Sequence, residues 1–258
     1  MRKSKTLKKI RDGRAARMCV LGHFIPSYIH HAAGAGFDVI WLDMEHRTFS
    51  DNEIAALLTH FHLADIDCML RPPTVEKTKL YRYLEDGAAG LMIPHVSTAE
   101  KARELVAAVK FPPLGERGLD GAGLDANYYL EDAESYPAEA NRETFLVVQI
   151  ETIEAVKNVD EIAAVPGVDG MFVGPGDLGL RLKELDNEGL DLEAVYEKVA
   201  AAAKREGIAW GCPAGSPELV EKLRAQGAQL LAYGGDFMTL KNMLDNNGKE
   251  LTRIYGED

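Results

Sequence analysis

The segment Phe145–Gly179 constrains the fold of this chain more than any other. It opens with the apolar run Phe145–Ile150, passes through a helical pattern, and reaches a second apolar run at Gly170–Gly174. Two short apolar runs joined by one helix predict a strand–helix–strand unit with parallel strands. Glu151 and Asp177 follow these two strands, so we expect both carboxylates at the same edge of a parallel sheet.

The same alternation continues along the whole chain. Strands are expected at Met18–Gly22, Val39–Asp43, Cys68–Arg71, Gly90–Pro94, Phe145–Ile150, Gly170–Gly174, Ile208–Cys212 and Leu230–Gly234. Eight parallel strands close naturally into a (β/α)8 TIM barrel, and 258 residues are a normal length for one such domain, here residues 1–258. The alternative is an open doubly wound sheet. Its nucleotide signatures fail, because the glycines of Gly118–Gly123 follow no strand and no GxxxxGK[ST] occurs.

Helical patterns fill the spaces between these strands. They are expected at Pro26–Ala33, Asn52–Leu63, Lys77–Glu85, Ala99–Val109, Thr152–Ala164 and Leu192–Arg205, with two more opening at Pro217 and near Asp236. Ser97 and Glu100 have the spacing of a capping box, and Asp236 is expected to cap the last helix.

The segment 111–144 breaks this rhythm with two adjacent prolines, several glycines and a pair of tyrosines. A connection of this length is usually a functional loop or an oligomer arm. The polar tail after Asp245 is expected to pack on a neighbouring subunit.

Composition narrows the class of partner. The net charge of −12 argues against nucleic acid, since no basic stripe offsets it. One basic cluster is expected to solvate a helical N-terminus: Arg2, Lys3, Lys5, Lys8, Lys9, Arg11 and Arg14. Three isolated cysteines fit a reducing compartment, and no apolar run has the length of a membrane span. These features favour a cytoplasmic protein that acts on a small molecule.

The residues at the strand ends suggest chemistry. The second to sixth strands deliver Asp43 with His46, Arg71, His95, Gln149 with Glu151, and Asp177. Carboxylate oxygens beside water and substrate suit Mg²⁺ or Mn²⁺, and no predicted strand carries the lysine that a Schiff base needs. We therefore expect a metal-assisted enzyme.

Each of these residues also has a structural interpretation. Glu151 suits a helix start, Asp177 suits a helix cap, and Asp43 suits an ordinary ion pair with Arg71. His95 is interpreted as a loop residue. The functional interpretation rests on finding all these residue types at one barrel face.

The chain resembles the metal-dependent (class II) pyruvate aldolases, which act on 4-hydroxy-2-oxoheptanedioate and 2-keto-3-deoxy-sugar acids. The matching segments are AGAGFDVIWLDMEH (33–46), MLRPP (69–73), GAAGLMIPHVSTAEKA (87–102), PPLGERG (112–118), VVQIET (147–152) and DGMFVGPGDL (169–178). They occur in the order of the family and cover about two-thirds of the chain.

This resemblance implies a (β/α)8 barrel, a homo-oligomer that is usually a hexamer, and a divalent cation (Mg²⁺, Mn²⁺ or Co²⁺). It implies Glu151 and Asp177 as metal ligands and Arg71 as the group that binds the keto oxygen. It further implies His46 with Asp43 for acid/base chemistry. The remaining implied residues are Gln149 as support for the metal, Asp86 as electrostatic support, and the backbone of Gly174 and Pro175 for the substrate carboxylate.

The chain departs from the family in three places. Gly179-Leu180-Arg181 occurs after Asp177 where the family often has alanine or serine. Met44 replaces a commoner glycine, and residues 119–129 are unlike the best-known members. These departures bear more on the substrate than on the chemistry.

Three alternatives remain open. The same site suits another metal-enolate lyase, either an oxaloacetate decarboxylase or a lyase of the citrate lyase type acting on acyl-CoA esters. A phosphosugar enzyme would need a glycine-rich phosphate cradle after the seventh and eighth strands. A barrel that only binds a metabolite is the third.

Overall fold

A closed barrel of parallel strands forms the centre of the computed structural model, which describes residues 1–185 and 189–256. The strands are β1 (Ala16–Leu21), β2 (Val39–Asp43), β3 (Asp67–Arg71), β4 (Gly90–Ile93), β5 (Phe145–Ile150), β6 (Gly170–Val173), β7 (Ala209–Pro213) and β8 (Leu230–Gly235). They pair in chain order, and β8 closes on β1. The predicted TIM barrel is therefore confirmed, and no strand bound differs from the prediction by more than two residues.

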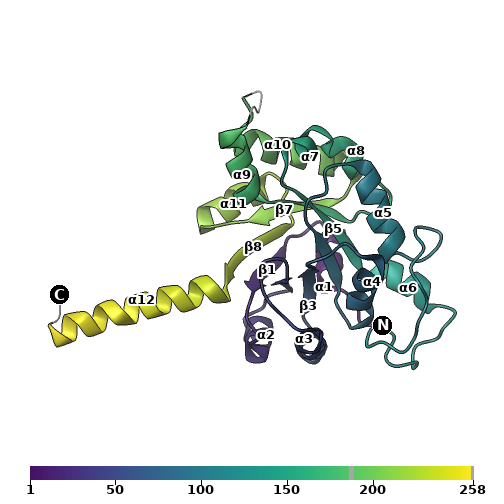
Figure 1. Cartoon of the computed structure of the whole chain (residues 1–258), viewed down its shortest axis with the longest axis horizontal. Coiled ribbons are helices and arrows are strands. Elements are labelled where there is room, and N and C mark those ends of the chain that lie inside the picture. The colour runs from purple at the N-terminus through teal and green to yellow at the C-terminus, as the bar shows by residue number, and fades with distance from the viewer. Residues whose placement is uncertain (186–188, 257–258) are drawn as a thin grey trace.

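Helices surround the barrel (Figure 1). Their bounds are α1 (Lys5–Arg11), α2 (Pro26–Gly34), α3 (Asp51–Leu63), α4 (Lys77–Glu85), α5 (Ala99–Val109), α6 (Tyr136–Glu143), α7 (Ile153–Lys157), α8 (Val159–Ala163), α9 (Pro175–Glu184), α10 (Leu192–Glu206), α11 (Pro217–Ala225) and α12 (Asp236–Tyr255). Among the described residues, no helix combines the length and the apolar character needed to cross a membrane.

Two local predictions were wrong. The N-cap of α5 is Thr98, whereas Ser97 is hydrogen-bonded to Thr152. Asp236 does not cap α12. Its carboxylate instead accepts hydrogen bonds from the backbone N–H groups of Gly22 and His23 and lies 2.6 Å from the His23 ring, which fastens β8 to the end of β1.

The strands alternate between two cores because successive side chains point to opposite faces. One face packs against the outer helices, and the other fills the barrel. The inward residues include Trp41 on β2, Met69 on β3 and Val147 on β5. Two residues further along, the same inward rows reach Asp43, Arg71 and Gln149. Because every second side chain of a strand points inward, polar side chains gather at the carboxyl end of the barrel.

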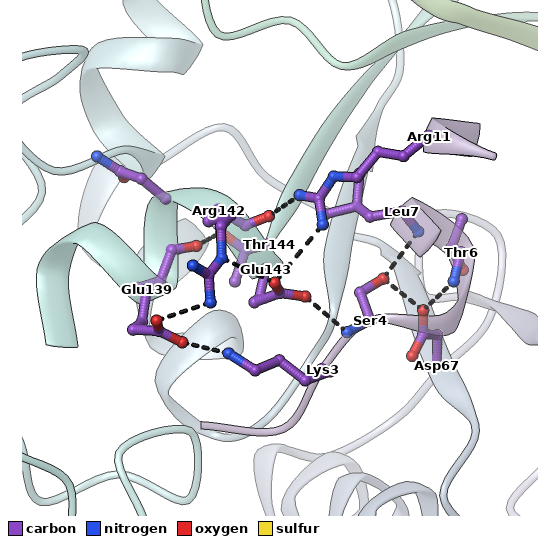
Figure 2. Close-up of polar contacts among 12 residues, drawn as sticks. Lys3, Ser4, Thr6, Leu7, Arg11, Asp67, Glu139, Arg142, Glu143 and Thr144 are labelled. Atoms are coloured by element: carbon purple, nitrogen blue, oxygen red, sulfur yellow. Dashed lines mark hydrogen bonds and ion pairs between the residues drawn. The ribbon is translucent and has the colours of Figure 1, made fainter. Parts of the chain in front are cut away.

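Helix α1 covers the opposite end of the barrel, where Leu7 joins the inner core. Ser4 caps this helix, and the fully buried carboxylate of Asp67 accepts hydrogen bonds from Ser4 Oγ and the Thr6 N–H (Figure 2). Glu143 accepts a hydrogen bond from the Ser4 N–H. These contacts anchor α1 beneath β3 and β5.

The basic cluster is not simply solvated, as the sequence suggested. Each of its members lies within ion-pair distance of a carboxylate: Arg2, Lys3, Lys5, Lys8, Lys9, Arg11 and Arg14. The excess of acidic residues supplies these partners. Most of the pairs are exposed and contribute little stability.

Helix α12 is longer than the polar tail suggested and projects away from the barrel (Figure 1). Asp236 is its only buried residue. In a (β/α)8 barrel the helix after β8 normally returns to cover the strands. Here a hollow of about 710 Å³ remains over β1 and β8, beside α11 and bordered by Phe37, Val220 and Leu231.

Candidate active site

Asp43 and Arg71 form the base of the site. They are aligned in the register of β2 and β3. Arg71 Nε lies 2.9 Å from Asp43 Oδ1, and Arg71 Nη2 lies 2.9 Å from Asp43 Oδ2. Both residues are buried, and a two-pronged pair of this kind fixes the plane of the guanidinium.

Three further groups surround the guanidinium of Arg71. Its Nη1 lies 2.8 Å from Glu45 Oε2, as an ion pair without hydrogen-bond geometry, and 3.3 Å from Gln149 Oε1. Its central carbon lies 4.7 Å from the centre of a Trp41 ring. Arg71 is thus a preorganised cation.

Glu151 is buried just beyond the end of β5. Its Oε1 accepts a hydrogen bond of 2.6 Å from the His95 N–H, and its Oε2 accepts one of 3.3 Å from Gln149 Nε2. Burial raises the pKa of Glu151; the His95 N–H and ring oppose this rise, and the carboxylates of Glu45 and Asp177 add to it. A cation at this position would relieve both the burial and the repulsion.

Gly174 makes room for Glu151. A Cβ at position 174 would lie 2.7 Å from Glu151 Oε2 and 3.3 Å from Gln149 Nε2. The site therefore has a space that any side chain at this position would fill.

Asp177 reaches the site from α9. Gly174 is the N-cap of this helix, so Pro175 and Gly176 already belong to its first turn and Asp177 is not the cap. The first N–H groups of a helix have no intrahelical partner, and together with the helix dipole they favour an anion. Because proline has no N–H, the available donors next to Pro175 are those of Gly176 and Asp177.

His95 joins these carboxylates, so its interpretation as a loop residue was incomplete. One ligand atom each from His95, Glu151 and Asp177 lies within 4.8 Å of the other two. His95 has a φ of +56°, an uncommon conformation for a residue other than glycine, which costs about 1–3 kcal/mol. The three groups together fit a divalent cation.

Two of the predicted site residues are placed differently from what the resemblance implied. His46 is exposed and lies 3.7 Å from Glu45 Oε2; among the described residues no contact joins it to Asp43. Asp86 ends α4 ahead of β4 and so lies near the amino-terminal end of the strands, away from Arg71. Burial raises the pKa of Asp86.

A cavity of about 230 Å³ opens at the carboxyl end of the barrel. It is lined by Trp41, His46, Arg71, Gln149, Glu151, Phe172, Gly174, Pro175, Gly176, Asp177 and Pro213. The larger hollow over β1 and β8 contains none of these residues, so the smaller cavity is the candidate site. No lysine lines it within the described ranges, which agrees with the absence of a Schiff-base lysine from the predicted strands.

No role was predicted for Glu45 from the sequence. Its two carboxylate oxygens lie near Arg71, His46 and His95. A signal was present, because Glu45 is two residues after Asp43 and follows the same strand. The bridge to His95 spans β2 and β4, a contact that only the closed barrel reveals.

Comparisons with known proteins identify the family of this chain. The family model described as HpcH/HpaI aldolase/citrate lyase matches residues 17–243. The 2-keto-3-deoxy-L-rhamnonate aldolase of Klebsiella pneumoniae subsp. pneumoniae is 36% identical over 215 residues, which are 83% of this chain and 80% of that protein. The enzyme of the same name from Escherichia coli K12 is 34% identical over 87% of this chain and 86% of its own length.

A solved structure gives the same result. The HpcH/HpaI aldolase from Desulfitobacterium hafniense DCB-2 superposes with a TM-score of 0.88 at 33% identity, covering 95% of each chain. The similarity thus extends over the whole barrel. The chain belongs to the HpcH/HpaI aldolase/citrate lyase family, and it is a carbon–carbon lyase of the aldolase type.

Proposed function

We propose that this aldolase uses a divalent cation to cleave 4-hydroxy-2-oxo acids reversibly into pyruvate and an aldehyde, as the class II enzymes do. The observation that carries the proposal is the arrangement of Arg71 in one cavity with the carboxylates of Glu151 and Asp177. A fixed cation beside a pair of metal-ligating carboxylates suits a reaction in which negative charge develops on a keto oxygen.

Glu151 and Asp177 are the residues that would hold the cation, and Gln149 supports Glu151 through its amide. Mg²⁺, Mn²⁺ and Co²⁺ all suit oxygen ligands with open positions. When bound, the cation would act as a Lewis acid on the keto group.

The protein groups then position pyruvate. The N–H groups of Gly176 and Asp177, at the start of α9, have no intrahelical partners and suit the substrate carboxylate. Gly174 and Pro175 shape the turn that presents these donors. Arg71 directs its guanidinium at the keto oxygen, where it stabilises the charge of the enolate. Asp43 and Glu45 keep that guanidinium in place.

Proton transfer is assigned to His46. His46 lines the cavity, and its Nε2 lies 3.7 Å from Glu45 Oε2, so it is placed to accept a proton and return it. In the cleavage direction, a base removes the proton of the C4 hydroxyl, the C3–C4 bond breaks, the aldehyde leaves and an enolate remains. Protonation of C3 then gives pyruvate.

The proposed substrate class is the 2-keto-3-deoxy sugar acids. The two curated relatives described above carry the name of a 2-keto-3-deoxy-L-rhamnonate aldolase. The test is to mix the purified protein with such an acid and to follow pyruvate with lactate dehydrogenase. We expect pyruvate release that chelation abolishes and added Mn²⁺ restores, and no release by Glu151→Gln. Release that is unaffected by chelation, or that survives in Glu151→Gln, would contradict the proposal.

The chain is further proposed to act as a homo-oligomer, a hexamer by resemblance, in which α12 packs on a second copy. Apolar side chains repeat along one stripe of this helix at positions Phe237, Leu240, Leu244, Leu251 and Ile254, and all five are exposed. The spacings of three, four and seven residues are those of a helix packed along one face.

The occupant of the hollow over β1 and β8 is therefore expected to be α12 of another copy. The hollow lies where the helix after β8 would return in a closed (β/α)8 barrel, and α12 leaves it uncovered. An isolated helix gains little stability in water, whereas burying an apolar stripe stabilises it.

A further inference from the structure

We propose that His95 is a third protein ligand of the cation, binding through Nδ1 beside Glu151 and Asp177, and that it shifts the metal preference of the site from Mg²⁺ towards Mn²⁺, Co²⁺ and other transition metals. This inference rests on the metal site of the proposed function and adds a nitrogen to its oxygen ligands. The two carboxylates alone would leave Mg²⁺ a suitable occupant.

The first support is distance. His95 Nδ1 lies 3.0 Å from Glu151 Oε1. Two donors that bind one cation at right angles, each with a bond of about 2.1 Å, are roughly 3.0 Å apart, and two opposite donors are roughly 4.2 Å apart. The largest separation among the three ligand atoms is within 4.8 Å. The side chains of His95 and Asp177 are exposed, so small rotations bring their ligand atoms to the separations that one cation requires.

The second support is the backbone at His95. Its positive φ points both the N–H and the imidazole Nδ1 towards the same carboxylate oxygen of Glu151. Unfavourable backbone conformations of this kind concentrate at functional sites.

The third support is the partner of the other ring nitrogen. His95 Nε2 lies 3.5 Å from Glu45 Oε1. With the ring proton on Nε2, facing Glu45, the lone pair of Nδ1 is free for a cation. Histidine ligands of metals are commonly oriented in this way by a carboxylate on the second nitrogen.

The chemical consequence is selectivity. Imidazole nitrogen suits transition metals such as Co²⁺, Ni²⁺ and Zn²⁺, whereas Mg²⁺ prefers oxygen. The competing arrangement is a hydrogen bond from His95 Nδ1 to Glu151, in which the ring binds no cation. The two arrangements differ in whether a nitrogen atom is bonded directly to the metal, and this difference is measurable without any assay of turnover.

The experiment is pulsed electron paramagnetic resonance on the full chain loaded with Mn²⁺, with natural and with ¹⁵N-labelled histidine. The test variant is His95→Asn, because asparagine also adopts positive φ and so removes the ring without new backbone strain. His46→Asn is the matched control, since it removes another exposed ring at the same cavity. Glu151→Gln tests the metal site itself.

We expect the wild-type protein and His46→Asn to show a directly bonded histidine nitrogen, and His95→Asn to bind Mn²⁺ without it. Loss of a residue that only supports a metal ligand weakens metal binding by roughly 10- to 100-fold, and loss of a ligand itself should cost at least as much. We therefore expect the dissociation constant for Co²⁺ to rise by at least this factor in His95→Asn. The dissociation constant for Mg²⁺ should rise far less.

The inference is overturned if Mn²⁺ binds through Glu151 but no histidine nitrogen is coupled to it, or if the coupling persists in His95→Asn. In that case the metal site of the proposed function stands without His95. If the wild-type protein binds no Mn²⁺ at all, both the metal site and this inference fail.

Discussion

Asp43 and Arg71 face each other across β2 and β3 and are joined by two contacts of 2.9 Å. Arg71→Ala is therefore a poor test of catalysis. It would leave the buried carboxylate of Asp43 without its partner and lower the free energy of unfolding by about 3–5 kcal/mol. Arg71→Lys is the better probe. It keeps the charge and loses the two-pronged geometry.

We expect Arg71→Lys to lower kcat by about 100- to 1000-fold, the usual effect of removing one donor that stabilises a developing oxyanion. The fold should persist, as checked by circular dichroism and thermal unfolding. Lys222→Arg, on the exposed face of α11, is the control, because it also exchanges one basic side chain for another. It should leave kcat unchanged. Near-normal kcat in a folded Arg71→Lys protein would contradict the role given to Arg71.

Gly174→Ala should weaken metal binding. The new methyl group would lie 2.7 Å from Glu151 Oε2, so the carboxylate must move. We expect a higher dissociation constant for Mn²⁺, measured by calorimetry, with a matching loss of turnover. Gly179→Ala is the control, because its Cβ would meet only Leu192, at an ordinary distance of 3.8 Å. Equal metal affinity in the two variants would contradict the claim that Gly174 leaves room for the Glu151 carboxylate.

Glu85 should make stability depend on pH. Burial raises its pKa to about 7 from 4.5, with Arg117 opposing the rise and Asp125 adding to it. The folded state therefore holds this proton more tightly than the unfolded state does. Its stabilising effect is complete below about pH 4.5 and is lost as the pH rises through 7.

We thus expect Glu85→Gln to be more stable than the wild-type protein at pH 8 by about 1 kcal/mol, a value discounted for solvent screening of this half-buried group. The difference should vanish near pH 4.5. Urea unfolding at several pH values measures it, with the exposed Glu104→Gln as control. A pH-independent difference, or an equal gain from Glu104→Gln, would show that the Glu85 carboxyl is not the cause.

Leu244→Glu should disrupt oligomers. Leu244 lies in the apolar stripe of α12 and is 63% exposed in the single chain. A charge there would oppose burial against a second copy. Sedimentation velocity should show a smaller species for Leu244→Glu than for the wild-type protein or for Asn246→Glu, which lies outside the stripe. A wild-type protein that sediments as a monomer would refute the oligomer.

The barrel and much of its site were predictable because both follow from local patterns. A period of two places Arg71 and Gln149 at the ends of inward-facing rows, and that period is visible in the sequence. The path of α12 was not predictable, because its direction depends on where its apolar stripe is buried. The grouping of Glu45 with His95 was also hidden, since it requires β2 and β4 to be placed around a closed barrel.

The resemblance implied roles for residues that a single chain does not bring together. His46 and Asp43 were expected as a pair, but Asp43 is engaged by Arg71, and Glu45 is the carboxylate near His46. Asp86 lies at the other end of the strands. Asp86 is therefore too far from Arg71 to support the site of its own chain, and its electrostatic role remains a prediction that would require several chains to assemble.

Deuterium exchange of the pyruvate methyl group tests the central claim most directly. The protein would be incubated with pyruvate in heavy water, with a chelator or with restored Mg²⁺, Mn²⁺ or Co²⁺, and the metal removed before the NMR measurement. We expect exchange that stops with the chelator and returns with the metal, and that is lost in Glu151→Gln. Absence of exchange with every metal would contradict enolate formation at this site.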